Sequence, residues 1–185
     1  MNKAKAESLK KHDWIKESLS NLEVSANPKY KIELTTNELD SEYINKKVKV
    51  LPTSNESDTT YIYVFKVTGK QRNVSKLKGV LEIEKKQQSS NSDEKNDLPR
   101  INNNSSGQYV YVGRSFDIRA RVRQHLSSGY RGTYALHLER WSCELNEKLE
   151  ILIYEFNAVN NVVIQAYEDA LWDYLKPCFG RKGDK

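Results

Sequence analysis

The chain has 185 residues and a net charge of +5 at pH 7, with 30% charged and 37% apolar residues. This composition is too polar for a membrane protein, and no run approaches the roughly 20 apolar residues that span a bilayer. Two cysteines fit neither a disulfide framework nor a zinc cluster, and the first residues do not resemble a secretory signal, so we expect a cytoplasmic location.

Residues 1–58 are expected to form an accessory segment. An amphipathic helix is predicted over 1–26, because apolar residues recur at helical spacing among lysines and glutamates until an Asn-Pro pair ends the pattern. Over 29–51 we expect a short alternating strand (Tyr30, Ile32, Leu34), a helical turn near 37–43 and a basic strand (Val48, Val50). Whether this segment dimerises, contacts DNA or covers the rest of the fold is open at this stage.

The remainder of the chain, 59–185, is expected to form one α+β domain. Strands are predicted at 61–67, 109–113 and 149–156, where β-branched and aromatic residues concentrate, and helices at 116–127, 134–140 and 162–175. The order of these elements favours a small three-stranded antiparallel sheet flanked by helices, with the N-terminal helix as an extension.

A polar insertion separates the first two predicted strands. Residues 86–108 contain only two strongly apolar side chains, Leu98 and Ile101, among asparagine, serine, glutamine and charged residues. Such a segment buries too little surface to offset the entropy lost on ordering. We therefore expect 86–108 to be a mobile loop.

Positive charge is concentrated in one part of the chain. Four of the nine arginines, Arg114, Arg119, Arg121 and Arg123, lie within ten residues, and the planar guanidinium group suits phosphate oxygens. At 100° per residue, Arg121 and His125 fall on one border of the predicted helix's apolar stripe, and Arg119 and Arg123 on the other. A border residue is held by packing and still reaches solvent, which suits a catalytic group. An ordinary solvated helix face would show the same charges.

An ordered set of short motifs resembles the GIY-YIG nuclease family. Tyr61-Ile62-Tyr63 is followed by Tyr111-Val112-Gly113, and Arg121 and His125 come ten and fourteen residues after Tyr111. These spacings are similar to those of phage homing endonucleases of the family. Glu168, in the last predicted helix, matches the family's metal-binding glutamate.

The resemblance extends over 59–185, with departures. Arg114 occupies the position of a catalytic lysine in the excision-repair incision subunit, and the segment 176–179 (KPCF) is similar to the family's closing segment. Tyr61 stands where the family signature has its first glycine. Tyr63 and Tyr111 are 48 positions apart, whereas in the family a short hairpin joins the two tyrosine motifs. Gly180 stands where the family has an asparagine, which puts one contact of the site in doubt.

The resemblance implies a metal-dependent DNA endonuclease. Glu168 would hold Mg²⁺ or Mn²⁺, because Mg²⁺ needs few protein ligands beside water and phosphate. Tyr63 would be the general base, its pKa lowered by positive charge, and Tyr111 would orient the water or Tyr63. Arg121 would stabilise charge on the phosphate, and His125 would take the proton of Tyr63 or bind a phosphate oxygen. Arg114, Arg119 and Arg123 would bind the DNA backbone.

Other interpretations remain open. Taken singly, each of these residues has an ordinary structural role: core aromatic, surface arginine, helix-face histidine or ion-paired glutamate. A restriction-type enzyme fits the chain best, and cutting both strands with one site per chain would favour a homodimer. The alternative is a module that has this fold and binds branched or single-stranded nucleic acid without cleaving it. A nuclease acting on RNA is a third.

Overall fold

A computed structural model describes residues 2–53, 58–68, 74–90, 98–103, 107–129 and 134–183. It is an α+β structure whose four strands form one antiparallel sheet in the order β1-β4-β2-β3. In chain order the elements are α1 (Asn2–Ser20), β1 (Tyr30–Thr35), a 3₁₀ turn (Thr36–Glu38), α2 (Ser41–Val48), β2 (Thr59–Thr68), α3 (Ser75–Ser90), β3 (Tyr109–Ser115), α4 (Ile118–Leu126), α5 (Leu138–Trp141), β4 (Lys148–Asn157) and α6 (Asn161–Leu175).

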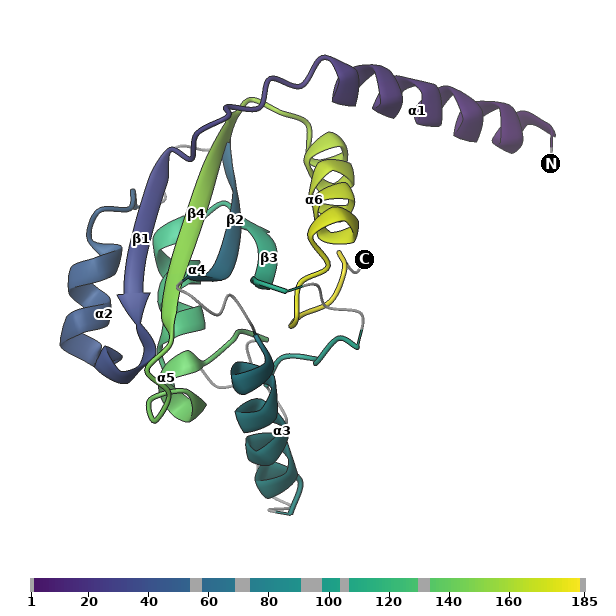
Figure 1. Cartoon of the computed structure of the whole chain (residues 1–185). Helices are drawn as coiled ribbons and strands as arrows, with labels where there is room; N and C mark the ends of the chain where they lie inside the picture. The colour runs from purple at the N-terminus through teal and green to yellow at the C-terminus, as the bar shows by residue number, and fades with distance from the viewer. Residues whose placement is uncertain are drawn as a thin grey trace.

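The prediction of a three-stranded sheet is wrong, because the accessory segment supplies a fourth strand. β1 lies beside β4 (Figure 1) and pairs with it antiparallel. Ile32 lies opposite Ile151 in this pairing. Ile32 and Leu34 point into the core, so the alternation that predicts the strand also gives it a buried face against the sheet. The basic strand expected at Val48 and Val50 is also wrong. Val48 ends α2, which begins where the Asp40 side chain accepts a hydrogen bond from the Tyr43 amide.

Helices cover both faces of the sheet (Figure 1). Alternate residues of a strand point to opposite faces, so Tyr63 and Phe65 enter the main core with α2 and α4, whereas Ile62 and Val64 face α6. β3 lies at the edge of the sheet between these two helical layers. Its side chains can therefore contribute to a site on either face.

The expected insertion is partly helical. α3, which the sequence patterns did not predict, includes residues 86–90, and its side chains Leu77 and Leu81 are buried. Residues 98–103 pack on the body of the protein: Leu98 is 2% exposed, and Ile101 forms a β-bridge with Phe179. The segments 91–97 and 104–106 lie outside the described residues, so the mobility expected there stays a prediction.

The predicted N-terminal helix is present as α1, which projects from the body of the protein (Figure 1). Its apolar residues Leu9 and Trp14 are exposed, and it contacts α6 near its C-terminal end. None of the helices among the described residues combines the length and apolar character that crossing a bilayer requires.

Candidate active site

Four of the predicted site residues form one hydrogen-bonded cluster. Tyr63 comes from β2, Tyr111 from β3, and Arg121 and His125 from α4. The Tyr63 hydroxyl lies 3.0 Å from His125 Nε2 and accepts a hydrogen bond from Arg121 Nε at 3.2 Å. The rings of Tyr63 and Tyr111 stack with centroids 6.1 Å apart. Residues separated by up to 62 positions thus meet at one hydroxyl group.

The hydrogen bonds of His125 determine which nitrogen carries its proton. The backbone N–H of Leu136 donates to Nδ1 at 3.0 Å, so Nδ1 is the acceptor and a neutral ring carries its proton on Nε2. Nε2–H therefore donates to Tyr63. Burial, followed by the charges of Arg121 and His137, holds the pKa of His125 well below its ordinary value, so the ring is neutral at pH 7.

This arrangement differs from what the sequence predicts for His125. The residue is 0% exposed rather than at a solvent-facing border, because the stripe that packs on the sheet is wide enough to include it. Both ring nitrogens are occupied, so the histidine has no acceptor with which to take a proton from Tyr63. Its geometry is that of a residue that positions the Tyr63 hydroxyl.

Tyr63 is also more deeply buried than a freely accessible base would be. It is 0% exposed, and burial, with a further contribution from Tyr111, raises its pKa above the ordinary value for a phenol. The positive charge and hydrogen bond of Arg121 act in the opposite direction but are the smaller effects. The lowered pKa that the general-base role implied for Tyr63 is therefore not found in this arrangement.

Tyr111 and Arg121 are the members of the cluster that reach a pocket. Both line a cavity of about 860 Å³, which we call the phenol pocket, together with Lys85 and Tyr134. Burial raises the pKa of Tyr111 too. The hydrogen bonds from Arg121 and Tyr63 oppose this shift but are smaller effects. A second guanidinium nitrogen of Arg121 donates to the carbonyl oxygen of Tyr134 at 2.9 Å and fixes the arginine at the pocket wall.

Two glycines allow the chain to pass close to the phenols. A Cβ atom at Gly113 would lie 2.6 Å from the Tyr63 hydroxyl oxygen, and one at Gly180 would lie 2.7 Å from Cε2 of Tyr111. Gly180 also has φ of +97°, a conformation that side chains disfavour. The family asparagine would clash at this position on this backbone, so Gly180 is part of how this chain packs Tyr111.

Glu168 lies on the other face of the sheet, on α6, where it pairs with Arg114 of β3. Arg114 Nε is 3.1 Å from Glu168 Oε2, and another of its nitrogens donates to the Gln165 side chain at 2.8 Å. The charge of Glu168 contributes to raising the pKa of both Tyr63 and Tyr111, so it acts on the cluster across the sheet edge. The carboxylate is near the phenols, and it forms an ion pair with Arg114.

A metal site built here would have a single protein carboxylate. Among the described residues, no group of three or more histidine, cysteine, aspartate or glutamate side chains could hold an ion. Glu168, beside a polar edge of the sheet, therefore remains as the single candidate metal ligand of the predicted site. One carboxylate, with water and substrate oxygens in the other positions, fits the way in which Mg²⁺ is bound at phosphate sites.

Two of the predicted DNA-binding arginines lie away from the cluster. Arg119 donates to the carbonyl oxygens of Leu51 and Lys49, at 2.6 and 3.0 Å, and joins α4 to the end of α2. The Nε atom of Arg123 is buried, without a hydrogen-bond partner among the described residues. Of the four-arginine window, Arg114 pairs with Glu168 and Arg121 donates a hydrogen bond to Tyr63.

The sequence patterns did not predict the basic side chains next to the phenol pocket, Lys85, Arg100 and Arg181. Arg181 directly follows Gly180 and the segment 176–179, which resembles the closing segment of the GIY-YIG family, and this position was the available signal. Lys85 and Arg100 lie in or beside the polar insertion at 86–108, where no pattern distinguishes them.

The chain matches no family model, no curated protein and no solved structure.

Proposed function

We propose that this protein is a metal-dependent endonuclease that hydrolyses phosphodiester bonds in DNA. The observation that carries the proposal is the convergence of Tyr63, Tyr111, Arg121 and His125 on one hydrogen-bonded cluster that opens into a basic pocket. A core aromatic cluster needs neither a buried arginine nor a histidine with both nitrogens engaged. The resemblance to the GIY-YIG family selected these same residues from their order and spacing.

The reaction requires water to attack phosphorus while the bond to the 3′-oxygen breaks. Arg121, at the pocket wall, stabilises the charge that develops on the phosphate oxygens. Glu168 would hold Mg²⁺ or Mn²⁺, which supplies further polarisation of the phosphate. Arg114 orients the Glu168 carboxylate through the 3.1 Å contact and the bond to Gln165.

Proton removal from the water is assigned to the two phenols as a coupled pair, acting in the form that carries one negative charge. Burial raises the pKa of both phenols, so this ionised form is the minor one at pH 7. Tyr63 accepts hydrogen bonds from His125 and Arg121, which would stabilise its negative charge, and it hydrogen-bonds Tyr111. Tyr111 lines the pocket and is the phenol that can approach the water. Because strongly interacting groups titrate together, the pair rather than either residue defines the base.

A plasmid-nicking assay with Mg²⁺ tests the proposal. Glu168→Gln and Tyr63→Phe are each expected to slow nicking by about 10²-fold or more. Glu42→Gln, which changes an exposed carboxylate on α2, is the matched control and should cut as the wild type does. Equal products from the wild type and Glu168→Gln would show that the nicking is contamination and that the enzyme proposal fails.

The second candidate function is nucleic-acid binding without cleavage. The observation favouring it is the raised pKa of both phenols together with the Arg114–Glu168 ion pair, which competes with a metal for the carboxylate. This alternative expects retained DNA binding and no nicking at any Mg²⁺ or Mn²⁺ concentration. Matched DNA and RNA duplexes in the same assay distinguish the two substrates.

A further inference from the structure

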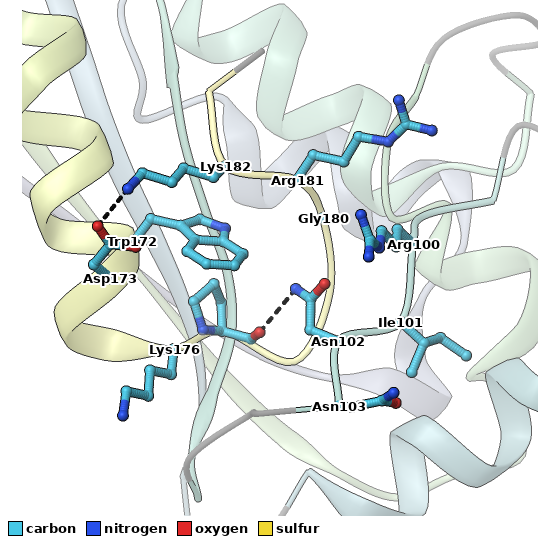
Figure 2. A pocket seen from close by; sticks show the side chains of 11 residues that line it. Arg100, Ile101, Asn102, Asn103, Trp172, Asp173, Lys176, Gly180, Arg181 and Lys182 are labelled. Carbon is cyan, nitrogen blue, oxygen red and sulfur yellow. Dashed lines mark hydrogen bonds and ion pairs between the residues drawn. The ribbon is translucent and has the colours of Figure 1, made fainter.

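A second cavity lies beside the phenol pocket. It has a volume of about 760 Å³, and we call it the flanking pocket. Its walls come from α6, from residues 100–103 and from the chain after α6, with Trp172 at one side and Lys182 paired to Asp173 (Figure 2). The two pockets share Arg100, Ile101, Gly180 and Arg181 in their walls, so they adjoin one another.

The segment between the pockets is held rigidly. The Gly180 amide donates a hydrogen bond to the Arg100 carbonyl at 2.9 Å. In return, the Asn102 amide donates to the carbonyl of Cys178 at 2.8 Å. The Asn102 side chain also donates to the Pro177 carbonyl at 3.0 Å (Figure 2). Arg100 and Arg181 therefore project from a fixed backbone at the junction of the two pockets.

Among the described residues, the lining of this double pocket is rich in positive charge. It contains six basic residues and one carboxylate, Asp173, which pairs with Lys182. The basic residues are Lys85, Arg100, Arg121, Lys176, Arg181 and Lys182. Among the described residues, the side chains of Arg100 and Lys176 have no ion-pair or hydrogen-bond partner. Burial and the charge of Arg181 lower the pKa of Lys85, as expected where like charges crowd together.

Aromatic rings alternate with these charges. Tyr134 is 66% exposed, and the Arg181 guanidinium lies over its ring at 5.7 Å. Tyr111 lines the phenol pocket, and Trp172 lines the flanking pocket. A track for duplex phosphates needs only cations, whereas grooves for single strands combine cations along the backbone with aromatic faces on which unpaired bases stack.

We propose that the two pockets form one groove that binds an unpaired stretch of a DNA strand, with Arg100 and Arg181 on its phosphates and Tyr134 against a base. This inference rests on the proposed function, since it places the strand next to the reacting phosphate at Tyr111 and Arg121. The substrate is then a DNA with a single-stranded segment at the cut, such as a locally unpaired region of a supercoiled plasmid, rather than a uniform relaxed duplex.

Binding is measured by fluorescence anisotropy with a short fluorescein-labelled single-stranded DNA and its duplex, in EDTA so that nothing is cleaved. The wild type should bind the single strand more tightly. The affinity falls as salt rises, and the double variant Arg100→Ala/Arg181→Ala should make this dependence shallower. The slope of log affinity against log salt should decrease in magnitude by about 1.4, or about 0.7 for each phosphate contact removed. Lys46→Ala/Lys49→Ala, which removes two exposed charges near the end of α2, is the matched control and should leave the slope unchanged.

Tyr134→Leu tests the stacking contact separately, because this side chain is exposed and the backbone carbonyl that holds Arg121 is retained. Its affinity for the single strand should fall about fivefold or more, and its affinity for the duplex should not change. Equal binding of duplex and single strand, or groove variants that bind as the wild type does, would overturn the groove.

The outcomes for the groove and for the enzyme are separable. Nicking with Mg²⁺ by a protein whose groove variants bind normally would keep the nuclease and remove the groove. Groove-dependent binding of single strands by a protein that does not nick would keep the groove and remove the nuclease.

Discussion

The two faces of the sheet at its β3 edge hold the two halves of the candidate site in different ways. On the α4 face, Tyr63 and His125 are fully buried, and each polar atom of the imidazole has a defined partner. On the α6 face, Arg114 and Glu168 form a partly exposed ion pair, at 28% and 13% side-chain exposure. A buried network is costly to break, whereas an ion pair that solvent reaches contributes little to stability.

The difference indicates a division of labour between the faces. The α4 face fixes the positions of the phenols and is part of the core that folds the protein. The α6 face carries the solvent-accessible ion pair of Arg114 and Glu168, whose carboxylate would hold the metal ion in the proposed function. Substitutions on the two faces should therefore separate stability from activity, and the following predictions test that separation.

The largest effect on stability is expected for His125→Ala. It leaves the Tyr63 hydroxyl and the Leu136 amide without their buried partner and creates a cavity, which should cost about 2–5 kcal/mol of unfolding free energy. Urea denaturation measures the loss. His12→Ala, on the exposed face of α1, is the control and should change stability by less than about 0.5 kcal/mol. A small loss for His125→Ala would mean that the cluster is not part of the core.

Gly180→Ala should come next, with a loss of about 1–3 kcal/mol. The added Cβ meets Tyr111 at 2.7 Å and must adopt φ of +97°. Gly79→Ala provides the contrast, since nothing lies within 4 Å of a Cβ there and alanine favours the α3 helix. Thermal unfolding of both variants gives the comparison. If the two behave alike, then the backbone at 180 can move away from the phenol.

The pH dependence of stability should follow from the neutral state of His125. Its pKa is lowered in the folded protein, so below about pH 6.5 the unfolded chain binds the extra proton and stability falls as the pH decreases. The stabilisation is complete above that pH and decreases by up to about 1.4 kcal/mol for each pH unit below it. The difference in unfolding free energy between the wild type and His125→Gln, measured from about pH 7.5 to 5.5, isolates this effect. A constant difference would show that His125 titrates normally.

The smallest effect on stability is expected for Glu168→Gln. Removing the charge from the pair with Arg114 should change the unfolding free energy by no more than about 1 kcal/mol. The same variant is expected to lose nicking. Glu168→Gln should therefore lose activity with little change in stability, whereas His125→Ala should lose stability. A strongly destabilised Glu168→Gln protein would contradict the comparison between the faces.

The resemblance to the GIY-YIG family selected the four residues of the phenol cluster, Tyr63, Tyr111, Arg121 and His125, and periodicity predicted the strands and the helix that carry them. Tyr63 and Tyr111 come from strands rich in β-branched and aromatic residues, and Arg121 and His125 lie one turn apart on α4. Periodicity does not show how deeply a side chain is buried. It placed His125 at a solvent border, although the histidine is buried, and it could not show that Arg119 contacts two backbone carbonyls from a loop about 70 residues earlier.

Predictions failed where an element depends on a distant partner. The number of strands was wrong because β1 was assigned to an accessory segment, although only its pairing with β4 decides where it belongs. α3 was not predicted within a polar stretch, because its buried residues Leu77 and Leu81 lie among lysines and glutamates that obscure the apolar stripe. The basic residues of the two pockets were missed for a similar reason, since Arg100 and Arg181 are far apart in the sequence and the hydrogen bond from the Gly180 amide to the Arg100 carbonyl brings them together.

The position of β1 also decides how this protein can be divided in the laboratory. A fragment starting at residue 59 would carry every residue of the phenol cluster and would still lack the strand that covers β4. The long free edge left behind, with Ile151 and Ile153 beside it, is the kind of surface through which sheets join into aggregates. Insolubility of such a fragment would therefore say nothing against the proposed nuclease activity, and shortened versions should keep the chain from Tyr30 onwards.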